Sequence, residues 1–169
     1  CTAAQGGYYA SIGGAAANSA ATGETQAVAG KYACRASDSD GTGEATGADD
    51  QCDCPVGMYS ASAGLTVCTA AQAGYYASIN GGEAALAATG ETQAVAGKYA
   101  CRKNDNDGTG EATGADDECD CPAGRYSATA GVTECTACAV GTYTSSAGLT
   151  ECTAAQGGYY ASIGGAAAN

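Results

Sequence analysis

Cysteines are the residues of this chain whose type and spacing most clearly predict chemistry. Eleven occur among 169 residues, and histidine is absent. Two cysteines stand fourteen residues apart, around a Gly-x-Tyr motif and a later glycine, in three segments: CPVGMYSASAGLTVC (54–68), CPAGRYSATAGVTEC (121–135) and CAVGTYTSSAGLTEC (138–152). Two further pairs stand eighteen residues apart around an acidic segment. The spacing predicts five disulfides: Cys34–Cys52, Cys54–Cys68, Cys101–Cys119, Cys121–Cys135 and Cys138–Cys152.

The remaining cysteine, Cys1, is explained by an internal repeat. Residues 1–18 recur letter for letter at 152–169, so the sequence has a period of 151 residues. Cys1 is therefore equivalent to Cys152, and we expect its partner upstream of this sequence, in a longer tandem array.

Degenerate copies of the fourteen-residue spacing support the pairing. When residues 1–18 are aligned with 135–152, Ala4 and Asn18 stand where Cys138 and Cys152 stand. In a second degenerate copy the corresponding residues are Ala71 and Ala85. Both ends of one bridge are missing together, as pairing predicts, because the loss of one end alone would leave a free thiol.

Metal or redox chemistry is the alternative for these cysteines. It is suggested by the CxxC at 135–138 and by the CDC triplets at 52–54 and 119–121. Structural zinc sites commonly combine two such knuckles, often with histidine. The sequence has neither a second CxxC nor a histidine, which favours structural disulfides.

The composition leaves little material for an ordinary core. Tryptophan and phenylalanine are absent, 27 residues are glycine, and the large aromatic side chains are eleven tyrosines. Many cysteines in a core-poor chain are typical of an oxidising, extracellular compartment. The net charge of −12 argues against nucleic acid and anionic membrane surfaces as partners.

Repeats define the domain organisation. Residues 1–67 and 68–134 are two long copies, identical at most positions; a short unit follows at 135–151, and 152–169 begins the next period. Gly-x-Tyr occurs three times in each long copy and once in the short unit, which gives seven small modules per period. We expect tandem disulfide-rich modules of short β-hairpins and irregular loops, with little helix, stacked as an extended rod or solenoid.

The CPxGxYSxxxGxxxC motif followed by CxxC resembles the ephrin-receptor-like cysteine-rich repeat, which is similar in style to the modules of tumour necrosis factor receptors. The likeness covers 52–68, 119–152 and their flanks, and only Gly-x-Tyr carries it in 1–33 and 69–100. Such repeats are found in secreted and surface proteins, among them ciliate immobilisation antigens and other protist coat proteins. The resemblance implies hairpin-like loops strung into a rod.

The tyrosines have two interpretations. They stack on the disulfide, glycine or tyrosine of the next module, or they fill the small core of their own module.

Acidic segments lie between the eighteen-spaced cysteines, SDSDGTGEATGADDQ (37–51) and NDNDGTGEATGADDE (104–118). Alternating carboxylates beside a glycine are typical of calcium loops. The candidate ligands are Asp38, Asp40 and Glu44 in the first copy, with Asp49 or Asp50 as an additional ligand, and Asp105, Asp107 and Glu111 in the second. The alternative is a solvated acidic turn that keeps the protein soluble.

These observations predict a structural protein, an extracellular filament or surface coat that self-associates. The alternative is a cysteine-rich stalk or binding module of a cell-surface receptor. No asparagine stands in an N-glycosylation motif, whereas dense Ser and Thr favour O-linked glycans. We do not expect the protein to be an enzyme, because no pair of a base and a nucleophile is evident in the sequence. We also expect no insertion of this segment into a membrane.

Overall fold

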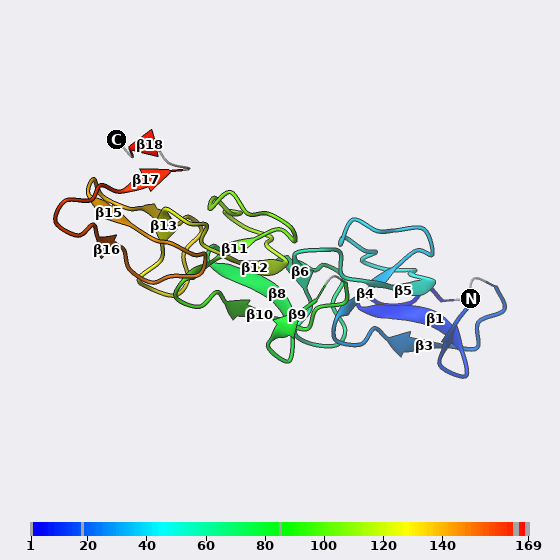
Figure 1. The fold of residues 1–169 in the computed structure, drawn as a ribbon. Coiled ribbons are helices and arrows are strands. Elements are labelled where there is room, and N and C mark those ends of the chain that lie inside the picture. The colour runs from blue at the N-terminus through cyan, green and yellow to red at the C-terminus, as the bar shows by residue number, and fades with distance from the viewer. Residues whose placement is uncertain (1, 18, 85, 164–165, 168–169) are drawn as a thin grey trace. The chain divides into compact units, whose positions relative to one another are not determined.

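The structure is a computed structural model, and it describes residues 2–17, 19–84, 86–163 and 166–167. Short strands and turns make up these residues, and none of them lies in a helix (Figure 1). The prediction of small disulfide-rich modules with short β-hairpins and little helix is confirmed. The extended rod stays a prediction.

The first seven strands, within residues 8–70, form one three-stranded sheet and two hairpins. The sheet has the order β2-β1-β3, and the hairpins are β4–β5 and β6–β7, all antiparallel. The bounds are β1 (Tyr8–Ile12), β2 (Ala15–Ala16), β3 (Gly23–Gln26), β4 (Lys31–Cys34), β5 (Asp50–Asp53), β6 (Met58–Tyr59) and β7 (Thr69–Ala70).

The next seven strands, within residues 75–137, repeat this order of elements. Its sheet is β10-β8-β9, followed by the hairpins β11–β12 and β13–β14. The bounds are β8 (Tyr75–Ile79), β9 (Gly82–Glu83), β10 (Gly90–Gln93), β11 (Lys98–Cys101), β12 (Asp117–Asp120), β13 (Arg125–Tyr126) and β14 (Thr136–Ala137). Two more hairpins follow, formed by β15 (Thr142–Tyr143) with β16 (Thr153–Ala154) and by β17 (Ser162–Ile163) with β18 (Ala166–Ala167).

Every Gly-x-Tyr motif begins with the same turn. In the first, the N–H of Tyr8 donates to the carbonyl of Gln5 at 3.0 Å, and Gly7 between them has φ +80°. A four-residue turn with positive φ at its third position is type II, which requires glycine there. The same bond precedes the strand in all eight motifs. The glycine therefore marks the turn, and the tyrosine is the second residue after it.

The chain divides into two compact units. One comprises Cys1–Ala71 with Ala77–Thr92, and the other comprises Gln72–Tyr76 with Gln93–Asn169. Each unit has several small cores of alanine, tyrosine and cysteine in place of one large one. The modules are therefore stabilised locally, as the lack of large apolar side chains requires.

Candidate functional site: the disulfides and the module junctions

Five disulfides are present in the structure: Cys34–Cys52, Cys54–Cys68, Cys101–Cys119, Cys121–Cys135 and Cys138–Cys152. They are the five pairs that the spacing predicts. Their Cα–Cα distances of 5.7 to 5.9 Å are ordinary for a disulfide. Cys1, Asn18 and Ala85 lie outside the described residues, so the upstream partner of Cys1 and the joint loss of paired cysteines stay predictions.

The bridges form the middle of two equivalent cores. In the first copy Tyr32 packs with Cys34, Cys54 and Cys68, all of them almost completely buried. Tyr32 lies opposite Cys52 in the β4–β5 hairpin, so one tyrosine contacts the bridge of its own hairpin and the bridge that follows. Tyr99 has the same surroundings in the second copy. Both interpretations of the tyrosines therefore apply to these two positions.

Three other tyrosines pack on alanines of the following module. Tyr9 packs with Ala27, Ala33 and Ala48, and Tyr76 with their equivalents in the second copy. Tyr59 packs against a different set of four alanines, Ala71, Ala77, Ala84 and Ala88. Alanine at these positions leaves room for the ring that comes from the preceding module.

To describe the contacts between modules, we number the modules from the residue that precedes each type II turn. They are 4–26, 27–53, 54–70, 71–93, 94–120, 121–137 and 138–154, each with one Gly-x-Tyr motif.

Consecutive modules are joined by two backbone hydrogen bonds, which we call the junction pair. In the contact of module 27–53 with 54–70, the N–H of Gly64 donates to the carbonyl of Ala27 at 2.8 Å. The N–H of Ala33, next to the motif tyrosine, donates to the carbonyl of Leu65 at 3.0 Å. Main-chain groups alone make these bonds, so the junction pair does not depend on which side chains the two modules carry.

The junction pair occurs at five contacts between modules that lie within one unit. The first bond joins the carbonyls of Ala4, Ala27, Cys54, Ala94 and Cys121, in this order, to the N–H groups of Gly47, Gly64, Ala87, Gly131 and Gly148, respectively. The second bond joins the N–H groups of Ala10, Ala33, Ser60, Ala100 and Ser127, in the same order, to the carbonyls of Ala48, Leu65, Ala88, Val132 and Leu149, respectively.

A left-handed residue provides the N–H of the first bond at each contact. Four of the five are glycines, and their φ values lie between 75° and 78°. The fifth is Ala87, with φ 56°. The sequence analysis missed this function of the second glycine, although its constant spacing was a signal: Gly64, Gly131 and Gly148 each follow their motif tyrosine by five residues.

The structure does not bring the predicted calcium ligands together. Among the described residues, no group of three or more His, Cys, Asp or Glu side chains is placed to share a metal ion. In the first copy Asp38 accepts the N–H of Arg35 at 3.0 Å, and Asp40 accepts the N–H of Thr42 at 2.8 Å. Glu44 forms an ion pair with Arg35 at 3.0 Å.

The second acidic segment repeats the contacts of Asp40 and Glu44, whereas Asp105 accepts a different N–H from that of its counterpart Asp38. Asp107 accepts the N–H of Thr109 at 2.7 Å, and Asp105 accepts that of Asp107 at 3.4 Å. Glu111 pairs with Arg102 at 3.1 Å. The carboxylates hold turns of their own loops and bind the neighbouring arginine. The calcium interpretation at the six candidate ligands, Asp38, Asp40, Glu44, Asp105, Asp107 and Glu111, therefore stays a prediction.

Each acidic segment is fastened to the core by a buried tyrosine. The hydroxyl of Tyr32 accepts the N–H of Gly41 at 3.3 Å, and that of Tyr99 accepts the N–H of Gly108 at 3.2 Å. Burial raises the pKa of both tyrosines above the usual 10.0, and nearby aspartates raise it further, whereas the bond from the glycine N–H acts against the rise. Both hydroxyls are therefore neutral at physiological pH.

Comparison with known proteins identifies no relative. The sequence matches no model of a known protein family, and it has no significant match among curated proteins. Within the described part of the chain, no helical segment has the length and hydropathy of a membrane span. The five disulfides make this a disulfide-rich protein of the extracellular type.

Proposed function

We propose that this chain is a structural, non-enzymatic subunit of an extracellular filament or surface coat. The observation that carries the proposal is the junction pair, which recurs with the same geometry at five contacts between modules. A filament requires one contact that can be repeated without limit, and a contact between neighbouring repeat units is of that kind.

The chemistry of the junctions supports a structural function. Their groups are main-chain N–H and carbonyl groups, glycines, alanines and tyrosine rings. None of these groups needs a metal or a cofactor, and the disulfides close five hairpins, β4–β5, β6–β7, β11–β12, β13–β14 and β15–β16. The near-identity of the two long copies fits selection for repeated contacts. We include in the proposal a kinship with the ephrin-receptor-like cysteine-rich repeats.

O-linked glycans are part of the proposal. In the segment 142–150 Thr144 is buried, whereas Ser145, Ser146 and Thr150 are exposed. Ser60 and Ser127 are also buried and donate hydrogen bonds to carbonyls of Ser62 and Thr129. Only the exposed hydroxyls are accessible to a glycosyltransferase, so mass spectrometry of native material should find glycans on them and not on the buried ones.

Electron microscopy tests the filament directly. Chains purified with their disulfides intact, and native material if it is at hand, are imaged at increasing protein concentration. We expect filaments whose axial repeat is constant, and we expect their loss when a reductant opens the bridges. Discrete particles at every concentration would support the receptor stalk instead.

A further inference from the structure

The hairpin that joins β8 to β9 ends in an Asn-Gly turn. Asn80 and Gly81 connect the two strands, and both have a left-handed backbone, with φ 53° and 83°. Positive φ at both central residues defines a type I′ turn, for which Asn-Gly is a favoured pair. Both residues are exposed, and open space surrounds the place where a Cβ of Gly81 would lie. The turn is therefore a solvent-exposed tip.

Asparagine followed by glycine has a chemistry of its own. The main-chain nitrogen of the residue after an asparagine can attack the carbon of the side-chain amide. Glycine favours this attack, because without a Cβ it lets the two atoms approach closely. Among Asn18, Asn80, Asn104 and Asn106, only Asn80 precedes a glycine.

We propose that Asn80 is a site of spontaneous modification, at which the chain converts its own asparagine to aspartate and isoaspartate. The Gly81 nitrogen forms a bond with Cγ of Asn80, the bond from Cγ to the amide nitrogen breaks, and ammonia leaves with the proton of the Gly81 N–H. Water then opens the cyclic imide. Addition of water at Cγ leaves aspartate, and addition at the main-chain carbonyl carbon of residue 80 leaves isoaspartate. This inference goes beyond the proposed function and does not depend on it.

The folded turn must open before the ring can form, because the cyclic imide fixes the backbone of residue 80 in a conformation other than that of a type I′ turn. Little holds the tip closed. β8 and β9 are joined by two residue pairs, Ser78↔Glu83 and Ile79↔Gly82, and both residues of β9 are exposed. Short, exposed pairing opens locally at a low cost in free energy. Opening of the tip therefore breaks little of the fold.

The first long copy has the same turn without the reactive amide. Gly13 and Gly14 stand at the positions equivalent to Asn80 and Gly81, with φ 61° and 89°. β1 and β2 are joined by two residue pairs, as β8 and β9 are. The fold therefore does not require the asparagine, and two otherwise similar copies differ in the chemistry of this tip.

The modification changes the tip in two ways. Each conversion replaces a neutral amide by a carboxylate. Isoaspartate also routes the main chain through the former side chain, which adds one carbon atom between Ile79 and Gly81. Because a type I′ turn has a fixed geometry, we expect isoaspartate to break the pairs of β8 with β9. Neither product returns to asparagine, so the modified fraction increases with the age of the protein.

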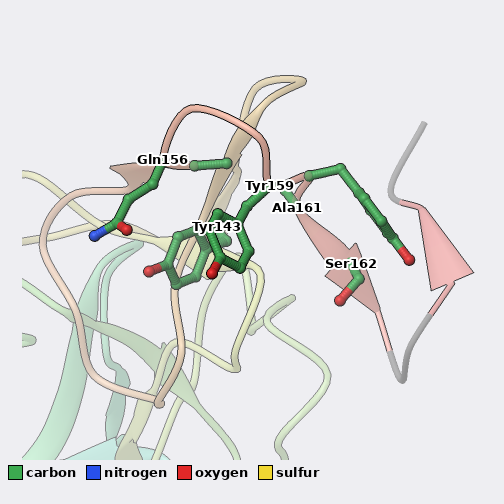
Figure 2. A pocket seen from close by; sticks show the side chains of 7 residues that line it. Tyr143, Gln156, Tyr159, Ala161 and Ser162 are labelled. Atoms are coloured by element: carbon green, nitrogen blue, oxygen red, sulfur yellow. The ribbon is translucent and has the colours of Figure 1, made fainter.

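Peptide mapping by mass spectrometry tests the proposal on the oxidised chain, incubated at physiological pH and temperature. We expect Asn80 to convert at least about tenfold faster than Asn104 and Asn106, which are also exposed but precede aspartate. Gln156 is a second control, because it is exposed and precedes Gly157; Figure 2 shows it among the residues that line a cavity with tyrosines. Its longer side chain would have to close a larger ring, so we expect it to stay intact while Asn80 converts.

Two substitutions exchange the turns of the copies. Asn80→Gly gives the second copy the turn of the first and should abolish the mass gain in the peptide that contains residue 80. Gly13→Asn places Asn-Gly in the first copy, where positive φ and open space accept asparagine. Residue 13 of this variant should then convert at a rate similar to that of Asn80.

The reduced and denatured chain gives the rate of conversion without the fold. The rate in the folded chain should lie within about tenfold of it, because the tip opens locally. The proposal is overturned if Asn80 converts no faster than Asn104, or if it stays intact in the folded chain while the denatured chain converts. A Gly13→Asn variant that stays intact would also contradict it. Electron microscopy of filaments is independent of these results, so the proposed function stands or fails separately.

Discussion

At the scale of single residues, glycines are needed where two modules come closest. Gly30 has φ +84°, and a Cβ at this position would collide with the backbone carbonyl oxygen of Ala87 in unit 1. Gly23, by comparison, lies in β3 with open space where its Cβ would be. Two glycines of one copy therefore differ sharply in the side chain that they tolerate.

Gly30→Ala should lower the free energy of unfolding by about 1–3 kcal/mol, because alanine at positive φ is strained and cannot avoid that carbonyl. Gly23→Ala should change it by about 0.5 kcal/mol or less. Denaturant unfolding with the disulfides intact measures both. Equal effects of the two substitutions would contradict the close approach at Gly30.

Buried tyrosines make stability depend on alkaline pH. The folded state raises the pKa of Tyr32 and Tyr99 above 10.0, chiefly by burial. The folded protein then holds these protons more tightly than the unfolded chain does. The contribution of the two protonated hydroxyls to the free energy of unfolding is complete below pH 10.0. It is lost as the pH rises from 10.0 through the pKa of the folded state.

The double variant Tyr32→Phe, Tyr99→Phe should show a smaller loss of stability above pH 10 than the wild type. At neutral pH each substitution should cost about 1–2 kcal/mol, because the N–H of Gly41 or Gly108 loses its acceptor. Rapid denaturant titrations between pH 8 and 11 measure both effects. A decline as steep as that of the wild type would contradict the burial of the hydroxyls.

Single residues also show how far the sequence alone could predict the site. Cysteine pairs were predictable because a fixed spacing and a fixed repeat leave few combinations. The composition of the acidic segments matches a calcium loop, but it could not predict the ion pair of Glu44 with Arg35, because that contact depends on how β4 and the loop fold. The left-handed Ala87 has no signal in its residue type.

At the scale of elements, burial differs among the disulfide-closed hairpins. Cys54 and Cys68 are 0% and 2% exposed, and Cys121 and Cys135 are similar. Cys138 and Cys152 are both only partly buried. Thiol–disulfide exchange requires access of the attacking thiolate to a sulfur, so Cys138–Cys152 is more accessible than Cys54–Cys68 and Cys121–Cys135.

Limiting reductant should open Cys138–Cys152 before Cys54–Cys68 and Cys121–Cys135. Alkylation of the freed thiols followed by peptide mapping would show labels on this pair before any label on Cys54–Cys68. The homologous Cys121–Cys135 serves as the internal control, because its loop has the same length and differs in burial. Simultaneous labelling of all three bridges would argue for global unfolding as the path to reduction.

The hairpins themselves were predictable, and the way in which they connect was not. Turn glycines and cysteine spacing indicate where each hairpin closes. The pairing of β1 with β3 across the residues that follow β2 and the junction pair both depend on backbone conformation at isolated left-handed residues. Such positions leave a trace in the sequence only where glycine occupies them.

At the scale of the whole molecule, negative charge opposes association. The net charge is −12, and copies that associate as proposed must approach one another against this repulsion. Screening lengths fall from about 30 Å at 0.01 M salt to about 8 Å at 0.15 M. Association should therefore strengthen with salt.

The association constant of the wild type should rise several-fold when NaCl is raised from about 0.01 to about 0.15 M, as sedimentation velocity would measure. CaCl₂ and MgCl₂ at equal ionic strength should act alike, because the acidic side chains of the described residues form no shared ion site. A selective effect of calcium would show that association assembles a site that the single chain lacks.

The junction pair has a genetic consequence. Its bonds join main-chain atoms, and they link modules with different loops and with or without a disulfide. Unequal recombination that inserts or removes a whole module leaves two neighbours that still fit. The gene can therefore change in length while its product continues to fold, and near-identical copies side by side are the record that such a history leaves.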